Sequence, residues 1–381
     1  MTTAGYNFPL DLTIEILLRL PAKSLFRFRS VSKTWCSIIR SRQFASEFMS
    51  LSLSRPRLLF TFNNCCDTRL LFFSSPHQSC YLSSSPSSML ASKKNFLTMP
   101  IVMSSFDIVL SNSVRGFICS SLRGKFVVCN PNTRQVIHLG ENSFESDYDC
   151  YMYLGYDPSN DQYKVLRLTM NTRSHSPVEH SVCTLGGGEP SLYSWRNIKS
   201  SVIYYDCMHN GVCIDGVVYY EASLKVEYGN ASMRVSSFDV GSEQIRPMKT
   251  PEHFGGFLLT NYLGKLAAYH DVDDGYFALW VLDDVKNQVW TKKVCVFPSF
   301  TFTMLWDLDL RFAGITAAGE VVYAPLYFCD PFEVFCYDVE KKMERRVRVE
   351  GLVDDVYEGS TFKRRFHTSL LCCYVDNIMI L

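Results

Sequence analysis

The chain has 381 residues, of which 47% are hydrophobic and 20% charged, a composition that supports a folded core and excludes a disordered chain. Its 38 basic and 38 acidic residues leave a formal net charge of zero. A globally basic nucleic-acid-binding protein is therefore excluded, although a local basic patch is compatible with this balance.

The cysteines indicate the compartment. There are 15 of them, an odd number with irregular spacing. Asp11 and Glu15 interrupt the apolar positions near the N-terminus, so no signal peptide is expected, and no apolar run approaches the ~18 residues that cross a bilayer. We therefore expect reduced thiols in a soluble protein of the cytoplasm, the nucleus or both, without membrane contact.

Glycine marks the expected domain boundary, because Gly5 is the only glycine before Gly116. This distribution predicts helices first and a turn-rich β region afterwards. The fold class expected is α+β by domain: a small all-α domain at 5–50, followed by a large all-β, propeller-like domain at 51–381.

Four short helices are expected within residues 8–48. They should start near Leu10, Ser24, Ser32 and Ser41, where serine can cap the last three. The second helix is expected to bury Leu25, Phe28 and Val31. A bundle of about 40 residues buries too little surface to be secure alone, so this domain is expected to dock against something else.

The pattern changes to short apolar runs after residue 56. Residues 57–62 and 69–74 predict a β-hairpin. A serine-rich stretch around 74–95 predicts a loop, and phosphorylation there stays an open alternative.

Two themes repeat after residue 114. Apolar runs interrupted by a glycine turn begin at Gly211, Asn261 and Gly314. They alternate with runs that surround a polar turn, at 128–137, 237–245, 282–290 and 336–347. A weak period of hairpins predicts propeller-like blades of four strands.

The N-terminal segment 8–44 resembles an F-box. The features that carry the resemblance occur in order and nearly without gaps: Pro9-Leu10-Asp11-Leu12, Glu15-Ile16-Leu17, Leu20-Pro21-x-Lys23-Ser24-Leu25, Arg27-Phe28-Arg29, Val31-Ser32-Lys33, Trp35 and Ile38-Ile39. Phe8 stands where this family often has leucine or isoleucine, and both are apolar.

The rest of the chain resembles the plant-type F-box-associated domains of the type-three, kelch-like kind. The matching motifs include Arg55-Pro56-Arg57-Leu58-Leu59-Phe60, Arg115-Gly116-Phe117-Ile118, Cys129-Asn130-Pro131-Asn132-Thr133-Arg134 and Leu154-Gly155-Tyr156-Asp157-Pro158. The resemblance implies an all-β propeller, which agrees with the repeats.

The F-box resemblance implies binding to a Skp-type adaptor and, through it, to a cullin-RING ligase. The residues expected at or near the adaptor face are Pro9, Leu10, Leu12, Ile16, Leu17, Leu20, Pro21 and Leu25. Those expected to hold the helices together are Phe28, Val31, Trp35, Ile38 and Ile39. A purely structural role for all of them is the alternative.

Charge gives a second indication, because no acidic residue occurs between Glu15 and Glu47 while seven basic ones do. Such a run suits an acidic partner surface. A merely solvated basic face is an alternative, and nucleic acid is disfavoured because no stacking or recognition-helix pattern accompanies the run.

Motifs of enzymes are missing from the sequence. It has no Gly-x-Ser-x-Gly, phosphate-binding Gly-Lys-Ser/Thr or His-Glu-x-x-His. Cys207, His209 and Cys213 lack a standard zinc spacing. No catalytic residue, metal or cofactor is expected, and the polar turns at 130–133 and 157–161 are interpreted as structural.

The function expected is that of a non-catalytic substrate receptor of a Skp-cullin-F-box ubiquitin ligase, which binds an unknown target protein through its β domain. Polar loops at 142–152, 170–190 and 270–276, and aromatic clusters at 148–153, 204–205 and 254–257, are candidates for target binding, without a choice among them. The alternatives are an adaptor-binding regulator that forms no ligase, and a propeller that binds a glycan or small ligand.

Overall fold

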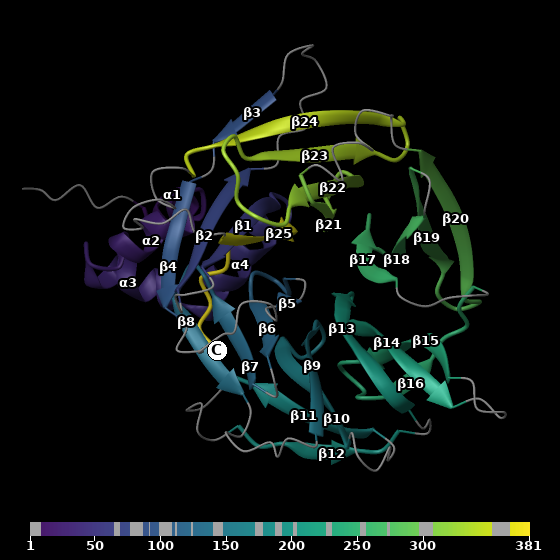
Figure 1. The fold of residues 1–381 in the computed structure, drawn as a ribbon. Helices are drawn as coiled ribbons and strands as arrows, with labels where there is room; N and C mark the ends of the chain where they lie inside the picture. Colours follow the sequence, from purple (N-terminus) through teal and green to yellow (C-terminus); the bar gives the residue numbers. More distant parts are fainter. Residues whose placement is uncertain are drawn as a thin grey trace, which may run out of the picture.

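The computed structural model describes residues 9–64, 69–76, 87–90, 92–98, 109–110, 113–122, 125–139, 148–171, 178–186, 193–200, 204–225, 231–251, 257–272, 275–296, 308–352 and 366–381. An α-helical domain comes first and is followed by a β-propeller (Figure 1). The fold class expected from the sequence is confirmed.

Four helices form the helical domain: α1 (Leu10–Leu18), α2 (Ala22–Phe28), α3 (Lys33–Arg40) and α4 (Arg42–Leu53). The caps predicted at Ser32 and Ser41 are confirmed, since their hydroxyl oxygens accept hydrogen bonds from the backbone N–H groups of Trp35 and Phe44 at 3.1 and 3.2 Å. No helix in the described part of the chain is long and apolar enough to span a membrane.

Two details of the helical prediction are wrong. The second helix starts at Ala22 after Pro21, not at Ser24, because proline has no N–H to satisfy and suits a helix start. Val31 follows the end of that helix and is 60% exposed, so it is not part of the core. The predicted domain boundary at residue 50 also falls inside α4.

The strands of the described residues form six sheets, which surround a central axis as blades (Figure 1). Blade 1 consists of β25 (Phe366–Tyr374), β1 (Arg57–Asn64), β2 (Arg69–Pro76) and β4 (Ser92–Thr98). Blade 2 consists of β5 (Val109–Leu110), β6 (Ile118–Leu122), β7 (Lys125–Asn130) and β8 (Gln135–Leu139). Blade 3 consists of β9 (Tyr148–Asp157), β10 (Gln162–Asn171), β11 (Glu179–Leu185) and β12 (Arg196–Ile198).

The remaining blades follow the chain in the same way. Blade 4 consists of β13 (Tyr204–Ile214), β14 (Val217–Lys225), β15 (Ala231–Asp239) and β16 (Ile245–Pro247). Blade 5 consists of β17 (Leu258–Tyr262), β18 (Lys265–Val272), β19 (Tyr276–Asp284) and β20 (Val289–Val296). Blade 6 consists of β21 (Leu310–Ile315), β22 (Glu320–Pro325), β23 (Glu333–Asp338), β24 (Met343–Glu350) and β3 (Ser87–Leu90).

Blade 1 closes the ring by joining the two ends of the propeller sequence. The last strand, β25, pairs antiparallel with the first, β1, with Phe60 opposite Leu370. The predicted hairpin of β1 and β2 is confirmed, with Phe60 opposite Phe73. Apolar side chains from blades 1 and 6 share one core around Phe60, Phe62 and Phe332.

The serine-rich stretch is not a loop throughout, because its described residues 87–90 and 92–98 form β3 and β4. β3 pairs in parallel with β24 at the edge of blade 6, and β4 pairs with β2 at the edge of blade 1. Backbone hydrogen bonds at a free sheet edge can recruit such a segment whatever its side chains are. Composition alone therefore misled the prediction.

The glycine-turn theme corresponds to the hairpins at the inner edge of the blades. Asp215-Gly216 joins β13 to β14 with φ values of +45° and +81°, and Leu263-Gly264 joins β17 to β18 with +52° and +84°. Positive φ at both central residues defines a type I′ turn, which matches the right-handed twist of paired strands. Both turns connect strands predicted from the repeats.

The polar-turn theme corresponds to the hairpins at the outer edge. In blades 2, 4, 5 and 6 an Asn or Asp ends the third strand and its side-chain oxygen accepts a backbone N–H two or three residues later. The fourth residue after it has a positive φ, as in Arg134, Glu243, Gln288 and Lys342. Local side-chain hydrogen bonds thus set the same reversal four times.

The segment after β25 ties the propeller to the helical domain. Asn130 donates from Nδ2 to the carbonyl oxygens of Asn377 and Met379, at 3.1 and 3.2 Å. Asn377 in turn donates to the carbonyl oxygen of Arg115 at 2.7 Å. Ile378 is buried with Leu17, Leu25 and other residues in the core of the helical domain. That core is therefore completed by the far end of the chain.

The turn at Leu263 yields a stability prediction. Leucine at a φ of +52° is strained, whereas asparagine tolerates this conformation. Leu263 is 53% exposed, so the substitution Leu263→Asn removes little packing. It should raise the free energy of unfolding by about 0.5–1 kcal/mol, measured by denaturant titration. The control is Val285→Asn, which replaces another exposed aliphatic residue in a turn and should give no gain; equal effects of the two would contradict the assignment of strain to Leu263.

Candidate functional site

The outer face of α1 exposes large aliphatic side chains. Leu12 and Ile16 are 47% and 49% exposed and lie one helical turn apart, so they share one face. Leu10, at the start of the helix, is 55% exposed. Pro9 and Pro21, on either side of the helix, are exposed as well. We define Leu12 and Ile16 as the α1 apolar face. Leu10 lies seven residues before Leu17, on the other side of the helix, and is exposed at the first residue of α1.

Two other residues predicted at the adaptor face lie inside the domain. Leu17 and Leu25 have no exposed surface and belong to the core of the helical domain, while Leu20 is half-buried. The period of α1 explains this result, since Leu17 points to the opposite side of the helix from Leu12. A substitution at Leu17 or Leu25 would disturb folding and could not test docking alone.

The predicted core residues divide in the same way. Ile39 is buried, and Phe28, Trp35 and Ile38 are half-buried against the same cluster. The rings of Phe28 and Trp35 meet edge to face at 5.3 Å between centroids. Val31, as noted, lies outside this core.

The charged residues of the helical domain are mainly basic and solvent-facing. Arg19 pairs with Glu15 at 2.5 Å, but both side chains are more than half exposed, so the pair adds little stability. The exposed basic residues that follow within this run are Lys23, Arg27, Lys33, Arg40 and Arg42. Their charge can accelerate encounter with an acidic protein surface.

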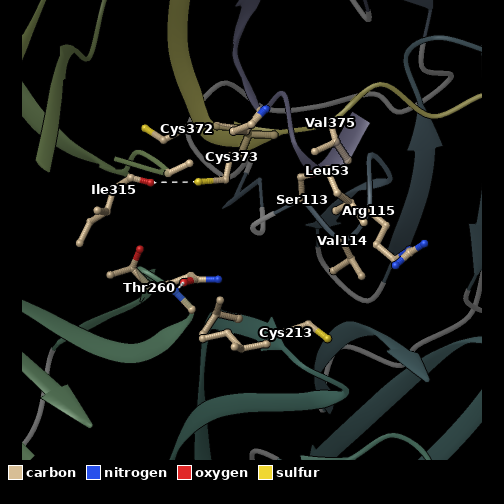
Figure 2. A pocket seen from close by; sticks show the side chains of 18 of the residues that line it. Leu53, Ser113, Val114, Arg115, Cys213, Thr260, Ile315, Cys372, Cys373 and Val375 are labelled. Atoms are coloured by element: carbon tan, nitrogen blue, oxygen red, sulfur yellow. Dashed lines mark hydrogen bonds between the residues drawn. The ribbon is translucent and has the colours of Figure 1, made fainter. Parts of the chain in front are cut away.

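A second candidate site is a cavity of about 420 Å³ on the propeller axis (Figure 2). Side chains from the inner strands of different blades surround it, including Cys213, Thr260, Ile315 and Cys373. Leu53 at the end of α4 contributes to the wall. The cavity therefore opens at the end of the propeller that carries the helical domain.

The polar groups of this axial cavity are only partly engaged. Cys373 Sγ donates to the carbonyl oxygen of Ile315 at 3.2 Å, whereas Ser113 Oγ and Arg115 Nε are buried without a hydrogen-bond partner among the described residues. Burial raises the pKa of both Cys213 and Cys373 to about 11, so these thiols are protonated at neutral pH and unsuited to nucleophilic attack. The Arg115 guanidinium lies 4.2 Å over the centroid of the Tyr156 ring. This contact covers one face of the Tyr156 ring.

The opposite end of the propeller is where most of the candidate target loops begin and end. Turns between the first and second strands, such as Asp215-Gly216, lie at the axial cavity. Because the strands are antiparallel, the connection between the second and third strands of each blade lies at the opposite end of the propeller. Of the predicted loops, 142–152 overlaps β9, 170–190 contains β11, and 270–276 overlaps both β18 and β19. Residues 142–147, 172–177, 187–190 and 273–274 lie outside the described residues.

The described side chains of the predicted aromatic clusters differ in exposure. Tyr153 is buried and stacks on Tyr220 at 5.0 Å between centroids, while Tyr148 is 41% exposed. Phe257 is buried and packs against His270. Phe254 and the side chains of Tyr204 and Tyr205 lie outside the described part of the chain.

The side chains of Cys207 and His209 lie outside the described part of the chain. Their arrangement with Cys213, for which no metal is expected, is therefore not tested. Among the described histidine, cysteine, aspartate and glutamate residues, no group of three or more is arranged to hold a metal ion. Every described cysteine is a free thiol.

The sequence analysis missed the tail after β25 as part of the helical domain. Ile378 reaches the domain core, and residues 378–381 line a cleft beside it. The only signal in the sequence is the apolar ending Ile378-Met379-Ile380-Leu381, which by itself does not say what it packs against.

Comparisons with known proteins agree with both parts of the architecture. Residues 6–46 match the family described as "F-box domain", and residues 57–377 match the "F-box associated beta propeller domain". The chain is 39% identical to F-box protein At1g30790 of Arabidopsis thaliana, covering 92% of this chain and 91% of that protein.

Two further relatives from Arabidopsis thaliana extend over most of the chain. F-box protein At5g65850 is 35% identical, with 94% of this chain and 88% of that protein covered. F-box/kelch-repeat protein At3g04660 is 32% identical, with 91% of this chain and 88% of that protein covered.

The contact between blades 4 and 5 yields a pH prediction. Burial raises the pKa of Glu221 to about 7, although its carboxylate accepts a hydrogen bond from the backbone N–H of Phe257 at 3.3 Å. The folded state thus holds this proton more tightly than the unfolded state, and stability falls as pH rises from about 4.5 to about 7. Glu221→Gln should remove this decrease in folding stability with rising pH.

The variant is therefore expected to unfold at a higher temperature than the wild type at pH 8, by the equivalent of about 3 kcal/mol, and at nearly the same temperature at pH 5. Thermal unfolding at the two pH values measures this. Glu179→Gln replaces an exposed glutamate and is the control. It should leave the unfolding temperature unchanged at both pH values. A gain of the same size at both pH values would refute the explanation.

Proposed function

Because the chain belongs to the F-box proteins that carry an F-box associated beta propeller domain, we propose that it is the substrate-recognition subunit of a Skp-cullin-F-box ubiquitin ligase. Its F-box would bind a Skp-type adaptor, and its propeller would bind a target protein. The family match of residues 6–46 carries this proposal.

The exposed aliphatic side chains of α1 support an adaptor site there. Leu12 and Ile16 are each about half exposed on a helix whose other side is already packed, and Leu10 is exposed at the first residue of that helix. Covering such side chains with a partner is favourable by about 25 cal/mol for each Å² of apolar surface removed from water. Basic residues around them suit an acidic adaptor surface.

The arrangement of the two domains supports target binding at the far end of the propeller. The F-box lies at the end where the inner-edge turns meet the axial cavity. The described strand ends at the opposite end lie away from the F-box, so a target can approach them. Loops on a rigid scaffold commonly carry binding residues.

The proposed mechanism is proximity, with no chemical step on this chain. A bound target would be held at a high effective concentration near the ubiquitin-charged enzyme. The protonated thiols of the axial cavity are in keeping with a non-catalytic role. Free thiols throughout the described residues suit a reducing compartment such as the cytoplasm or the nucleus.

The adaptor site is tested by the double variant Leu12→Asp/Ile16→Asp. Both residues are exposed, so the fold should persist, while two carboxylates at an apolar contact would be desolvated without partners. We expect affinity for a purified Skp-type adaptor to fall at least about 100-fold, measured by calorimetry or biosensor.

The matched control replaces two exposed valines of the propeller, Val285→Asp/Val289→Asp, and should leave adaptor binding unchanged. Circular dichroism must show that both variants are folded. A folded wild type that does not bind the adaptor would refute the proposal. Adaptor binding without recruitment of the cullin would favour the regulator that forms no ligase.

A further inference from the structure

A cleft separates the F-box from blade 3 and lies apart from both the α1 apolar face and the far end of the propeller. Its volume is about 700 Å³, which is within the range of small-molecule sites. Helices α2, α3 and α4 form one side, and the turn after β9 and the end of β11 form the other. The tail after β25 forms part of the wall.

The walls of this junction cleft are largely apolar. Phe26, Ile39 and Ala45 line it from the F-box, and Leu185 lines it from the propeller. Ile380 from the tail also lines it and is 63% exposed. A large aliphatic side chain left in water at the mouth of a cleft gains by contact with an apolar ligand.

The charges of the cleft are unbalanced. Three arginines line it, Arg29, Arg40 and Arg42, against one acidic residue among the described lining residues, Asp161. Arg42 pairs with Asp161 at 2.9 Å. Burial would raise the pKa of Asp161, but the hydrogen bonds from Arg42 and Tyr156 outweigh it and lower that pKa. Asp161 is thus ionised and neutralises only one arginine.

The guanidinium groups of Arg29 and Arg40 are available to bind an anionic ligand. Among the described residues, no carboxylate forms an ion pair with Arg29 or Arg40. The Arg29 guanidinium lies 5.6 Å over the ring of Phe26, which leaves its N–H groups able to donate at the edge. Guanidinium groups bind carboxylates and phosphates with paired hydrogen bonds.

We propose that the junction cleft binds a small amphipathic anion: an apolar body of about 15–25 heavy atoms, a size set by the cavity range of such sites, that carries one carboxylate or phosphate group. The apolar body would lie between Phe26, Leu185 and Ile380, with its anionic group at Arg29 and Arg40. Because the cleft has walls from both domains, this ligand would hold the F-box at a fixed angle to the propeller.

Two fluorescent probes that differ only in their charged group test the proposal on the full chain. 8-Anilinonaphthalene-1-sulfonate carries one anionic group, and N-phenyl-1-naphthylamine is the same body without it. We expect saturable, one-to-one binding of the sulfonate, at least about tenfold tighter than the neutral probe. The sulfonate should also raise the melting temperature, since it binds only the folded junction.

Matched variants locate the site. Arg40→Glu reverses an exposed charge that lines the cleft and should weaken sulfonate binding at least about tenfold. Arg27→Glu reverses an exposed charge on α2 outside the lining residues and should not. Ile380→Asp should weaken binding of the sulfonate probe to a similar extent as Arg40→Glu.

Displacement experiments then identify the anionic group. Decanoate and decyl phosphate present a carboxylate and a phosphate on the same chain, and decan-1-ol is the neutral counterpart. Displacement of the sulfonate probe by decanoate or decyl phosphate, but not by decan-1-ol, would support the proposal. The anion that displaces the probe would show whether the cleft binds a carboxylate or a phosphate. Absence of saturable binding, equal binding of the two probes, or equal effects of Arg40→Glu and Arg27→Glu would each overturn it.

Discussion

The pairing of β25 with β1 is the interaction on which the rest of the structure depends. These strands are separated by almost the whole propeller sequence, yet they are neighbours in blade 1. Without this pairing the ring of blades would end in two open sheet edges, and the shared core around Phe60 and Phe332 would lose one side. Closure turns six marginal sheets into one cooperative body with an axial cavity.

The same closure positions the F-box. Its helices are too few to bury their own apolar residues, and Ile378, four residues after the end of the closing strand, completes their core. Asn130 and Asn377 hold that segment through backbone carbonyls of the tail and of Arg115. The F-box and the propeller are therefore joined along one seam, and the junction cleft lies beside it.

Local chemistry explains why much of the fold could be predicted. Serine caps at Ser32 and Ser41, the hairpin of β1 and β2, and the two alternating turn themes depend on interactions within a few residues. The F-box pattern likewise lies in one continuous segment. These features were read correctly because a side chain and its partner are close in sequence. The loop predicted around 74–95 was wrong where β3 and β4 form, because distant sheet edges hold these strands.

The sequence by itself determined the class of the two domains, the repeated hairpins and the residues that belong to α1. Only the tertiary structure decided which of those residues remain at the surface: Leu12 and Ile16 are exposed, whereas Leu17 and Leu25 are sealed in part by Ile378. The physical reason is that burial is a property of contacts between segments far apart in the chain. A hydrophobic pattern predicts that a residue is buried, and the tertiary contacts of the closed ring determine which residues bury it.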